Sequence, residues 1–235
     1  MKKYAYTGQD NLEVMSGADN YNAYQRDFLL SALGSIDTVN PVILDFGAGI
    51  GTYADMLRSS RRGLTIECVE PTESQAKILR KKGYKVYKNI RDVKKQYDVV
   101  YSLNVLEHIE DDEAALKSQV SVLKPRGIVV AYVPAFMLLY GNLDRLVEHW
   151  RRYTFDDLKR IANQADVHVE SLRYCDPLGF FAALLYRVIG GSGHLKQSNV
   201  WLFDKIIFPL SSAIEPLTRG LFGKNALAIY RKNGE

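Results

Sequence analysis

Short apolar runs alternate with amphipathic stretches along most of the chain. The runs are rich in Val, Ile and Tyr and end at Gly, Pro or acidic residues, which is typical of strands buried in a parallel sheet. Between the runs, apolar residues recur with the spacing of one helix face. The predicted strands cover residues 42–44, 64–70, 84–87, 97–102, 128–133, 167–174 and 226–230, and the predicted helices cover 19–33, 52–57, 72–82, 110–123 and 154–165.

Strands that alternate with helices predict an α/β fold with a doubly wound, mostly parallel sheet. The chain has 235 residues, a length that suits one domain. We therefore expect a single domain over residues 1–235. Sheets of this kind bind ligands beyond the carboxyl ends of their strands, so the candidate site residues are sought there.

A glycine-rich turn follows the first predicted strand. After Asp45 come Gly47, Gly49 and Gly51, and a helix begins directly behind them. Glycine lets the chain turn sharply and lets a ligand lie against the backbone, while the helix start offers free N–H groups. The G-x-G-x-x-G pattern of dinucleotide sites does not fit, because the third glycine comes one residue early and Thr52 takes its place. An NAD-dependent oxidoreductase is therefore disfavoured.

Polar residues stand at the carboxyl ends of the next strands. Glu70 ends the second strand, where an acid can accept hydrogen bonds from a ribose diol. Asn89 follows the third strand and Asn104 the fourth. Because these ends meet at one edge of the sheet, the residues are candidates for binding one nucleoside-like ligand. The alternative for Glu70 is a charge that only starts a helix.

These features stand in an order that resembles a known family. The glycine turn, Glu70, the 97–100 strand, Val-Leu-Glu-His at 105–108 and Leu-Lys-Pro-Arg-Gly at 123–127 resemble class I S-adenosyl-L-methionine (SAM)-dependent methyltransferases. The small-molecule branch near the ubiquinone-pathway O-methyltransferases is the most similar. The resemblance covers most of residues 20–175. It implies SAM as the cofactor and a three-layer sandwich with a seven-stranded sheet of order 3-2-1-4-5-7-6, strand 7 being antiparallel.

The resemblance also implies which residues hold SAM. Asp45 would lie near its cationic amino-acid end, and Tyr21 on the first helix would touch the methionine end. Asn104 would face the cofactor, and Glu70 would bind the ribose. The family usually has Asp where Asn89 stands, but an amide oxygen can also accept from the adenine amino group. The adenosine is expected to lie against Gly47, Gly49 and Gly51, and its adenine edge against Asn89 and the backbone of Ile90.

Some ubiquinone-pathway enzymes carry a Glu-x-x-Glu-His metal site at the fourth strand. Asn104 stands in place of the first acid here, which leaves Glu107 and His108. Because one hard anionic ligand is missing, we expect no Mg²⁺ site and predict no metal. Glu107 and His108 are instead expected to order the loop.

A polar, aromatic segment after the fifth strand is the candidate acceptor site, because the resemblance places its H-x-R-R-Y pattern beside the acceptor. His149 could deprotonate an acceptor hydroxyl, since imidazole titrates near neutral pH. An arginine could hold an acceptor carboxylate or phosphate. Alternatively, His149 caps a turn, and one arginine pairs with Asp144 or Asp156. The candidate acceptor-binding residues are Tyr140, Arg151, Arg152 and Tyr153.

Residues 176–224 lie between the sixth and seventh predicted strands and are far more than a hairpin needs. Segments 178–189 and 201–210 are apolar nearly all round, and a glycine-rich break at 190–193 separates them as a hinge. We expect a helical insertion here. Three interpretations stay open: a lid over the acceptor, a homodimer face, or a peripheral contact with a membrane.

Charge and cysteine content limit the classes of function that we expect for this chain. The net charge of +4, from 31 basic and 27 acidic residues, is scattered and gives no nucleic-acid surface. Two cysteines without a C-x-x-C pattern, and no signal-peptide pattern at the start, indicate the cytoplasm, free or attached to a membrane. We predict methyl transfer to an oxygen or nitrogen of a small or lipid-like metabolite. The alternative is a catalytically silent SAM-fold binding module that acts through residues 176–224.

Overall fold

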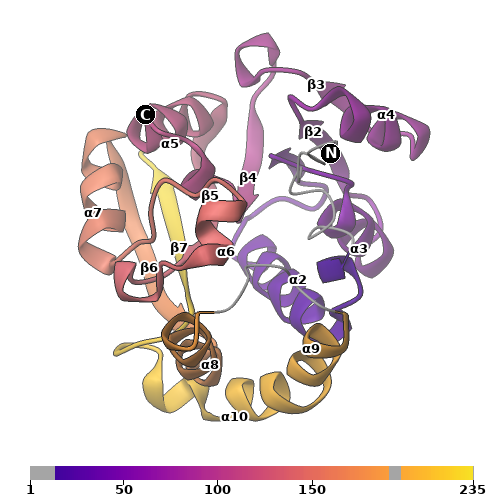
Figure 1. Cartoon of the computed structure of the whole chain (residues 1–235). Helices are drawn as coiled ribbons and strands as arrows, with labels where there is room; N and C mark the ends of the chain where they lie inside the picture. Colours follow the sequence, from indigo (N-terminus) through magenta and orange to yellow (C-terminus); the bar gives the residue numbers. More distant parts are fainter. Residues whose placement is uncertain (1–13, 191–196, 235) are drawn as a thin grey trace, which may run out of the picture.

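The computed structural model describes residues 14–190 and 197–234, and it confirms the predicted α/β sandwich (Figure 1). Seven strands form one sheet in the order β3-β2-β1-β4-β5-β7-β6. The strands are β1 (Val42–Phe46), β2 (Thr65–Val69), β3 (Lys85–Tyr87), β4 (Tyr97–Leu103), β5 (Leu123–Pro134), β6 (Val167–Cys175) and β7 (Asn225–Lys232).

The sheet is parallel from β3 to β5, whereas β7 runs antiparallel to both β5 and β6, as predicted. The chain enters the sheet at β1, builds outward to β3, and then returns to place β4 on the other side of β1. Strand order therefore reverses between β1 and β4. At such a point the loops that follow the two strands diverge, which leaves space for a ligand at the carboxyl edge.

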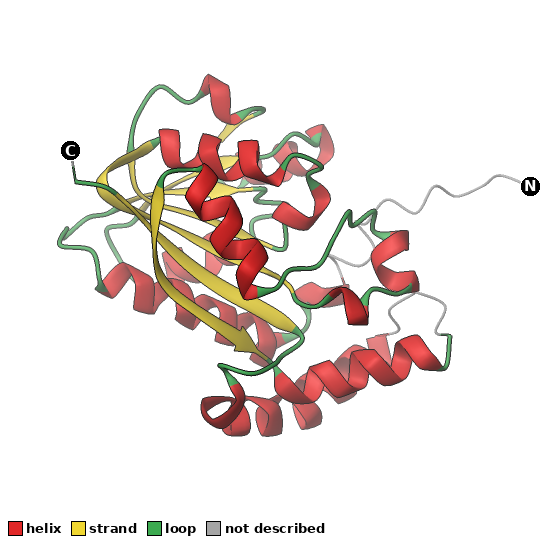
Figure 2. Ribbon diagram, turned by 90° about the vertical axis from the view of Figure 1, so that its left-hand side faces the viewer, coloured by secondary structure: helices red, strands yellow, loops and turns green. Residues whose placement is uncertain are grey.

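Helices cover both faces of the sheet (Figure 2). One core cluster contains Leu116 of α5 and Ile161 of α7, and the other contains Leu29 of α2, Leu57 of α3 and Leu79 of α4. All five side chains are buried, so each helix contributes its apolar face to a layer against the sheet. The bounds are α2 (Asp19–Gly34), α3 (Thr52–Ser60), α4 (Glu73–Lys81), α5 (Asp112–Ser121), α6 (Asn142–Leu146) and α7 (Phe155–Gln164), with the 3₁₀ turns η1 (Ile90–Asp92), η2 (Leu106–His108) and η3 (Met137–Leu139).

β5 begins earlier than the apolar pattern predicted. Leu123 already pairs with Tyr97 of β4, and a register shift separates this pair from the rest of the ladder. The polar stretch that follows continues the strand because Lys124 Nζ lies 2.8 Å from Asp98 Oδ2, so its charge is neutralised at the sheet edge. A search for apolar runs in the sequence cannot detect such a polar extension of a strand.

The insertion before β7 is helical, with α8 (Pro177–Val188), α9 (Gln197–Leu202), the π-helix η4 (Phe203–Ile207) and α10 (Phe208–Thr218). In Figure 1 these helices lie together below the sheet, next to α2. Asp204 Oδ1 accepts a hydrogen bond from the Tyr21 N–H at 2.9 Å, and Glu215 accepts one from the Tyr24 hydroxyl. Two buried acids thus attach the insertion to α2. Of the predicted break at 190–193, residues 191–193 lie outside the described part of the chain.

No helix in the described ranges is both long enough and apolar enough to cross a bilayer. The two cysteines lie in strands as buried free thiols, Cys68 in β2 and Cys175 at the end of β6. Burial raises the pKa of both, that of Cys175 to about 12. Both thiols are therefore protonated and shielded from solvent in the folded protein.

Candidate functional site

A cavity of about 1110 Å³ opens at the carboxyl ends of the parallel strands. Residues that follow β1 to β5 line one side of it, and residues around α6, in α8 and in α9 line the other. It lies where strand order reverses between β1 and β4. Pockets for single drug-sized ligands measure about 300–1,000 Å³, so this cavity has room for a second molecule beside a nucleoside.

The glycine turn between β1 and α3 forms one wall of the cavity. Gly47, Gly49 and Gly51 have φ angles of 79°, 56° and 83°, which residues with a Cβ rarely adopt. A Cβ on Gly47 would lie 2.6 Å from Cγ2 of Val105, so this glycine also lets the turn pack against the loop after β4. Gly47 and Gly49 line the cavity. Gly51 does not; it begins α3, packed against Leu79.

Glu70 ties the glycine turn to the end of β2. Its carboxylate accepts hydrogen bonds from the backbone N–H groups of Gly49 and Thr72, both at 2.8 Å. The residue is buried yet lines the cavity. A carboxylate has about four lone-pair sites, so two bonds leave Glu70 able to accept from the hydroxyls of a ribose.

Asp45 is a buried acid at the end of β1, in the wall of the cavity. Burial raises its pKa to about 7, although a hydrogen bond from the Tyr101 hydroxyl at 2.7 Å acts in the opposite direction. A cation bound beside Asp45 would favour the carboxylate form. The site is therefore suited to a ligand that carries a positive charge.

The other residues predicted to hold the cofactor also line the cavity. Tyr21 is buried on α2, and its hydroxyl donates to Oδ1 of Asn225 at 3.3 Å. Asn89 caps the short helix η1, which begins at Ile90. Asn104, directly after β4, has a φ of 56°. The fold thus brings the predicted cofactor residues to one edge of the sheet, with Gly51 just behind it.

These residues fit SAM. Gly47 gives a turn that a Cβ would obstruct, Glu70 can accept from a ribose diol, and Asp45 is a buried acid in the cavity wall that can face a cationic group. Sequence reasoning did not identify several neighbours in the same wall. Lys224, just before β7, and Asn225, its first residue, reach the cavity because the antiparallel strand returns to this edge, and no local pattern signals that.

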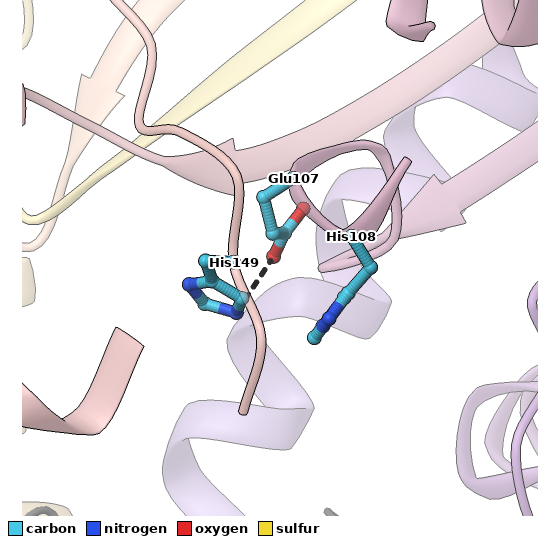
Figure 3. Close-up of side chains that lie close together, drawn as sticks. All are labelled: Glu107, His108 and His149. Atoms are coloured by element: carbon cyan, nitrogen blue, oxygen red, sulfur yellow. Dashed lines mark ion pairs between the residues drawn. The ribbon is translucent and has the colours of Figure 1, made fainter. Parts of the chain in front are cut away.

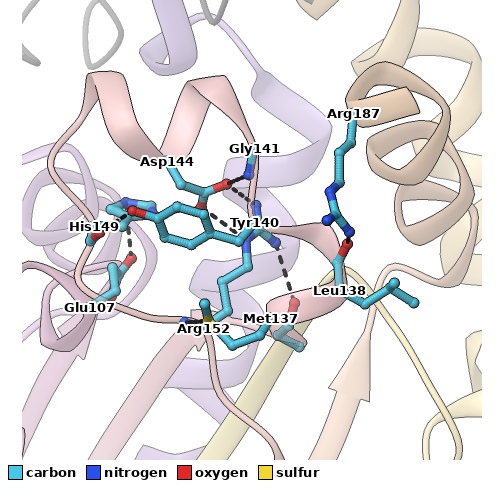
Figure 4. Close-up of polar contacts among 10 residues, drawn as sticks. Glu107, Met137, Leu138, Tyr140, Gly141, Asp144, His149, Arg152 and Arg187 are labelled. Atoms are coloured by element: carbon cyan, nitrogen blue, oxygen red, sulfur yellow. Dashed lines mark hydrogen bonds and ion pairs between the residues drawn. The ribbon is translucent and has the colours of Figure 1, made fainter. Parts of the chain in front are cut away.

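The opposite end of the cavity is built around Asp144 on α6 (Figure 4). Its carboxylate accepts from Nδ1 of His149 at 2.8 Å, from Nε of Arg152 at 2.8 Å and from the Gly141 N–H at 2.8 Å. Burial works against the charge, but the bonds from His149 and Arg152 outweigh it and lower the pKa of Asp144. With the proton of His149 on Nδ1, its Nε2 carries the free lone pair.

The remaining residues of the predicted acceptor segment are placed differently. Arg151 pairs with Asp112 at 2.8 Å and does not line the cavity. Tyr153 is fully buried, and the Tyr140 hydroxyl donates to the carbonyl of His149 at 2.7 Å from outside the cavity. Of the four candidate acceptor-binding residues, Arg152 alone lines the cavity, and Asp144 holds its guanidinium. The acceptor-binding roles of these residues stay predictions.

Glu107 and His108 lie beside His149 (Figure 3). Ligand-type atoms of the three residues are all within 4.8 Å of one another, so they could hold a metal ion. From the sequence, Glu107 and His108 were candidate metal ligands only together with Asn104. It could not find His149 as a neighbour, because the contact depends on how the loop after β4 packs against the loop after α6.

The insertion supplies apolar residues of the wall together with the polar Tyr186, Arg187 and Asn199. Ala182 and Ala183 of α8, Val200 of α9 and Phe203 of η4 face the cavity. The same helices bury the acid Asp204 against α2. The acceptor end of the cavity therefore combines a polar side, around Asp144, with an apolar side.

The sequence matches the family model described as a methyltransferase domain over residues 18–172. This range begins just before α2 and ends within β6, so it contains the glycine turn and the Asp144 network. No curated protein sequence matches the chain.

Solved structures of methyltransferases share the fold at low sequence identity. A protein assigned as a sarcosine dimethylglycine methyltransferase from Galdieria sulphuraria is similar with a TM-score of 0.62 and 18% identity, over 90% of this chain and 86% of that one. A coclaurine N-methyltransferase bound to N-methylheliamine and S-adenosylhomocysteine (SAH) gives 0.60 and 12%, over 90% and 72%. A mycolic acid cyclopropane synthase with SAH and CTAB gives 0.58 and 13%, over 89% and 82%.

Proposed function

Because the chain belongs to the family of proteins with a methyltransferase domain, we propose that it moves a methyl group from SAM to an oxygen or nitrogen of a small or lipid-like acceptor. One observation carries this proposal: a single cavity joins the glycine turn and Glu70 at one end to the Asp144–His149 pair at the other. An acceptor held at the second end would lie next to a cofactor held at the first. Proximity of this kind is the main contribution a protein can make to methyl transfer.

SAM supplies an activated methyl group on a sulfonium centre, so the protein has to align the acceptor and remove its proton. We assign cofactor binding to Asp45, Glu70, Tyr21 and the glycine turn. We assign removal of the acceptor's proton to the site formed by His149 and its neighbours. Asp144 favours the tautomer of His149 that leaves Nε2 free, and this nitrogen lies at the cavity with its side chain 13% exposed.

The apolar wall supports an acceptor with a hydrocarbon part. Ala182, Ala183 and Val200 offer no hydrogen-bonding side chain to a ligand, which favours aliphatic or aromatic groups over sugars. Two structures of similar fold hold ligands of this character, N-methylheliamine in one and CTAB in the other. The insertion is thus assigned to the acceptor pocket, and the acceptor is placed among lipid-like or aromatic metabolites.

The outside of the insertion supports a peripheral contact with an anionic membrane. The acids Asp176, Asp204 and Glu215 are buried, whereas Arg219 is exposed; Arg187 is also exposed, but it lines the cavity and donates to the Leu138 carbonyl. Apolar side chains beside a basic surface are what an anionic lipid layer attracts, while a second copy would bring like charges together. We call these side chains the outer face: Leu185, Val188, Trp201, Leu210, Leu217 and Leu221, all at least 58% exposed.

Calorimetry and product analysis test the function together. The protein is titrated with SAM, SAH and NAD, and then incubated with methyl-labelled SAM and a lipid extract or a hydrophilic extract. We expect SAM and SAH to bind, NAD not to bind, and label to appear in the lipid fraction. SAM binding with no labelled product in either extract would contradict the enzyme and favour a silent binding module. Label in the hydrophilic fraction alone would overturn the lipid-like acceptor.

A further inference from the structure

Glu107, His108 and His149 form a compact cluster at the acceptor end of the cavity (Figure 3). Glu107 Oε1 is 3.9 Å from Nε2 of His149, and one ligand-type atom from each residue lies within 4.8 Å of the other two. The backbone N–H of Trp150 donates to the carbonyl of Glu107 at 2.8 Å. This bond fixes the loop that carries His149 against η2, which carries the other two residues.

Within residues 14–190 and 197–234, the Glu107 side chain has no hydrogen-bond partner. It is fully buried, and neither of its oxygens accepts a bond from any residue in the described part of the chain. Burial raises its pKa to about 8. A buried carboxyl group without a partner is costly, so its presence in a cavity wall needs an explanation. A bound cation would supply the missing partner.

The His149 imidazole is braced in the way that metal-binding histidines usually are. Nδ1 donates to Asp144, whose other contacts are to Arg152 and Gly141, so Asp144 cannot readily move. Such a carboxylate–histidine pair fixes the ring and leaves Nε2 to bind a metal. Nε2 is also the atom of His149 that approaches Glu107.

We propose that Glu107, His108 and His149 bind one divalent transition-metal cation. Two imidazoles and one carboxylate are a ligand set for Zn²⁺ and similar ions, whereas Mg²⁺ prefers oxygen ligands and waters. Metal–ligand distances are about 2.0–2.2 Å, so the three side chains must draw slightly closer on binding. Three protein ligands would leave at least one coordination position free for another ligand.

The role of the cation rests on the proposed function. A cation here would bind the oxygen or nitrogen of the acceptor and make its proton easier to lose. Nε2 of His149 would then act as a ligand, so in the metal-bound protein the acceptor's proton would pass to solvent in the cavity and not to this nitrogen. The site itself can be tested without cofactor or acceptor, so its failure is distinguishable from failure of methyl transfer.

The experiment uses the full chain without a purification tag, freed of metal with a chelator. ZnCl₂ is titrated in the calorimeter, and CoCl₂ binding is followed by visible absorption. We expect one ion per chain. Glu107→Gln and His149→Gln should each weaken binding at least about tenfold, and Asp144→Asn, which weakens the support of His149 along with the pairing to Arg152, about 10–100-fold. Glu107→Gln replaces a buried carboxyl group, whose pKa burial raises to about 8, with an uncharged amide of the same shape, so it should fold without metal, which thermal unfolding checks.

Matched controls are available in the same chain. Glu110→Gln makes the same chemical change in the same loop, at an exposed side chain, and His168→Gln removes an exposed imidazole on β6. Both should bind Zn²⁺ like the wild type. No stoichiometric binding by the wild type, or equal binding by the wild type and both Glu107→Gln and His149→Gln, would overturn the proposal.

Discussion

Glu70 accepts a hydrogen bond from the backbone N–H of Gly49 at 2.8 Å, so the end of β2 holds the glycine turn that follows β1. The Glu70 carboxylate therefore holds the glycine turn in place and also offers a hydrogen-bond acceptor to the cofactor. Two strands that are adjacent in the sheet are coupled at the point where the ligand has to bind.

We expect Glu70→Ala to weaken SAM binding by about 1–3 kcal/mol, because a charged hydrogen-bond acceptor is lost. Calorimetry measures the change, with a melting curve to show that the variant is folded. Glu73→Ala, an exposed acid of α4 paired with Arg80, is the control and should leave affinity unchanged. Wild-type affinity in folded Glu70→Ala would remove Glu70 from the cofactor site.

SAM affinity should fall as the pH drops below about 7. Asp45, with a pKa of about 7 in the free protein, is protonated at low pH, while the cationic end of SAM favours the carboxylate. Binding must then release a proton, and affinity declines by up to about tenfold per pH unit. Above about pH 8, Asp45 is ionised in the free protein and no longer makes SAM affinity depend on pH.

Calorimetry at pH 6 in buffers of different ionisation enthalpy counts the released proton. Asp45→Asn has no proton to release, so it should bind SAM more weakly and without this pH dependence. An unchanged pH profile in Asp45→Asn would assign the effect to another group.

Gly47→Ala should destabilise the fold more than Gly83→Ala does. Both glycines have a left-handed φ, 79° and 86°, which costs an L-residue about 1–2 kcal/mol. A Cβ at 83 meets nothing within 4 Å, whereas a Cβ at 47 meets Val105 at 2.6 Å. The clash should add about 1–3 kcal/mol to the loss in unfolding free energy.

Urea unfolding of the two variants measures this difference directly. Adding Val105→Ala to Gly47→Ala should restore part of the extra loss, since it removes the clashing methyl groups. Equal losses for Gly47→Ala and Gly83→Ala would show that the loop after β4 can move aside.

His149→Ala should lower turnover by about 10²–10⁴ while SAM affinity stays near the wild-type value. The imidazole lines the cavity and is held by Asp144, away from the residues assigned to the cofactor. Transfer of labelled methyl to the responsive extract gives the rate, and calorimetry gives the affinity. His168→Ala is the control; turnover within a few-fold of wild type in His149→Ala would make His149 structural.

Binding to vesicles should depend on the outer face and on anionic lipid. Leu185→Glu and Trp201→Glu, at side chains 62% and 58% exposed, should reduce sedimentation with phosphatidylcholine vesicles that contain phosphatidylglycerol. Raising the salt concentration should weaken binding of the wild type, because the attraction is partly electrostatic.

Val39→Glu changes an exposed valine outside the insertion, 85% accessible, and should sediment like the wild type. If the wild-type protein does not sediment with the vesicles and instead forms a dimer that Leu185→Glu dissociates, the outer face is a contact between two copies.

The fold could be predicted because its signals are local. Alternating apolar runs indicated the strands, and the helix predicted over 154–165 begins at the N-cap residue of α7, Thr154. The structure shows the reciprocal bonds expected of that cap: Asp157 N–H to Thr154 Oγ1 at 3.3 Å, and Thr154 N–H to Asp157 Oδ2 at 2.9 Å. Most residues of the cofactor wall were predictable for the same reason, since they lie at or just after the end of a strand; Tyr21, on α2, was indicated by the family resemblance.

The acceptor end is different because it depends on packing between distant loops. The H-x-R-R-Y pattern indicated the correct segment, but only the folded chain turns Arg151 toward Asp112 and Arg152 toward Asp144. Likewise, Glu107 and His149 meet through the bond from Trp150, which no spacing in the sequence encodes.

The two buried thiols can report on local opening of the folded protein. Cys68 is in the parallel half of the sheet, near the cofactor wall, and Cys175 is in the antiparallel half, at the start of the insertion. A thiol reagent can modify either residue only when its part of the sheet opens. The two labelling rates, separated by peptide mapping, therefore measure the opening of each half, and ligands that bind one half should slow one cysteine before the other. A cysteine introduced on the outer face would also be the single reactive position in the folded protein.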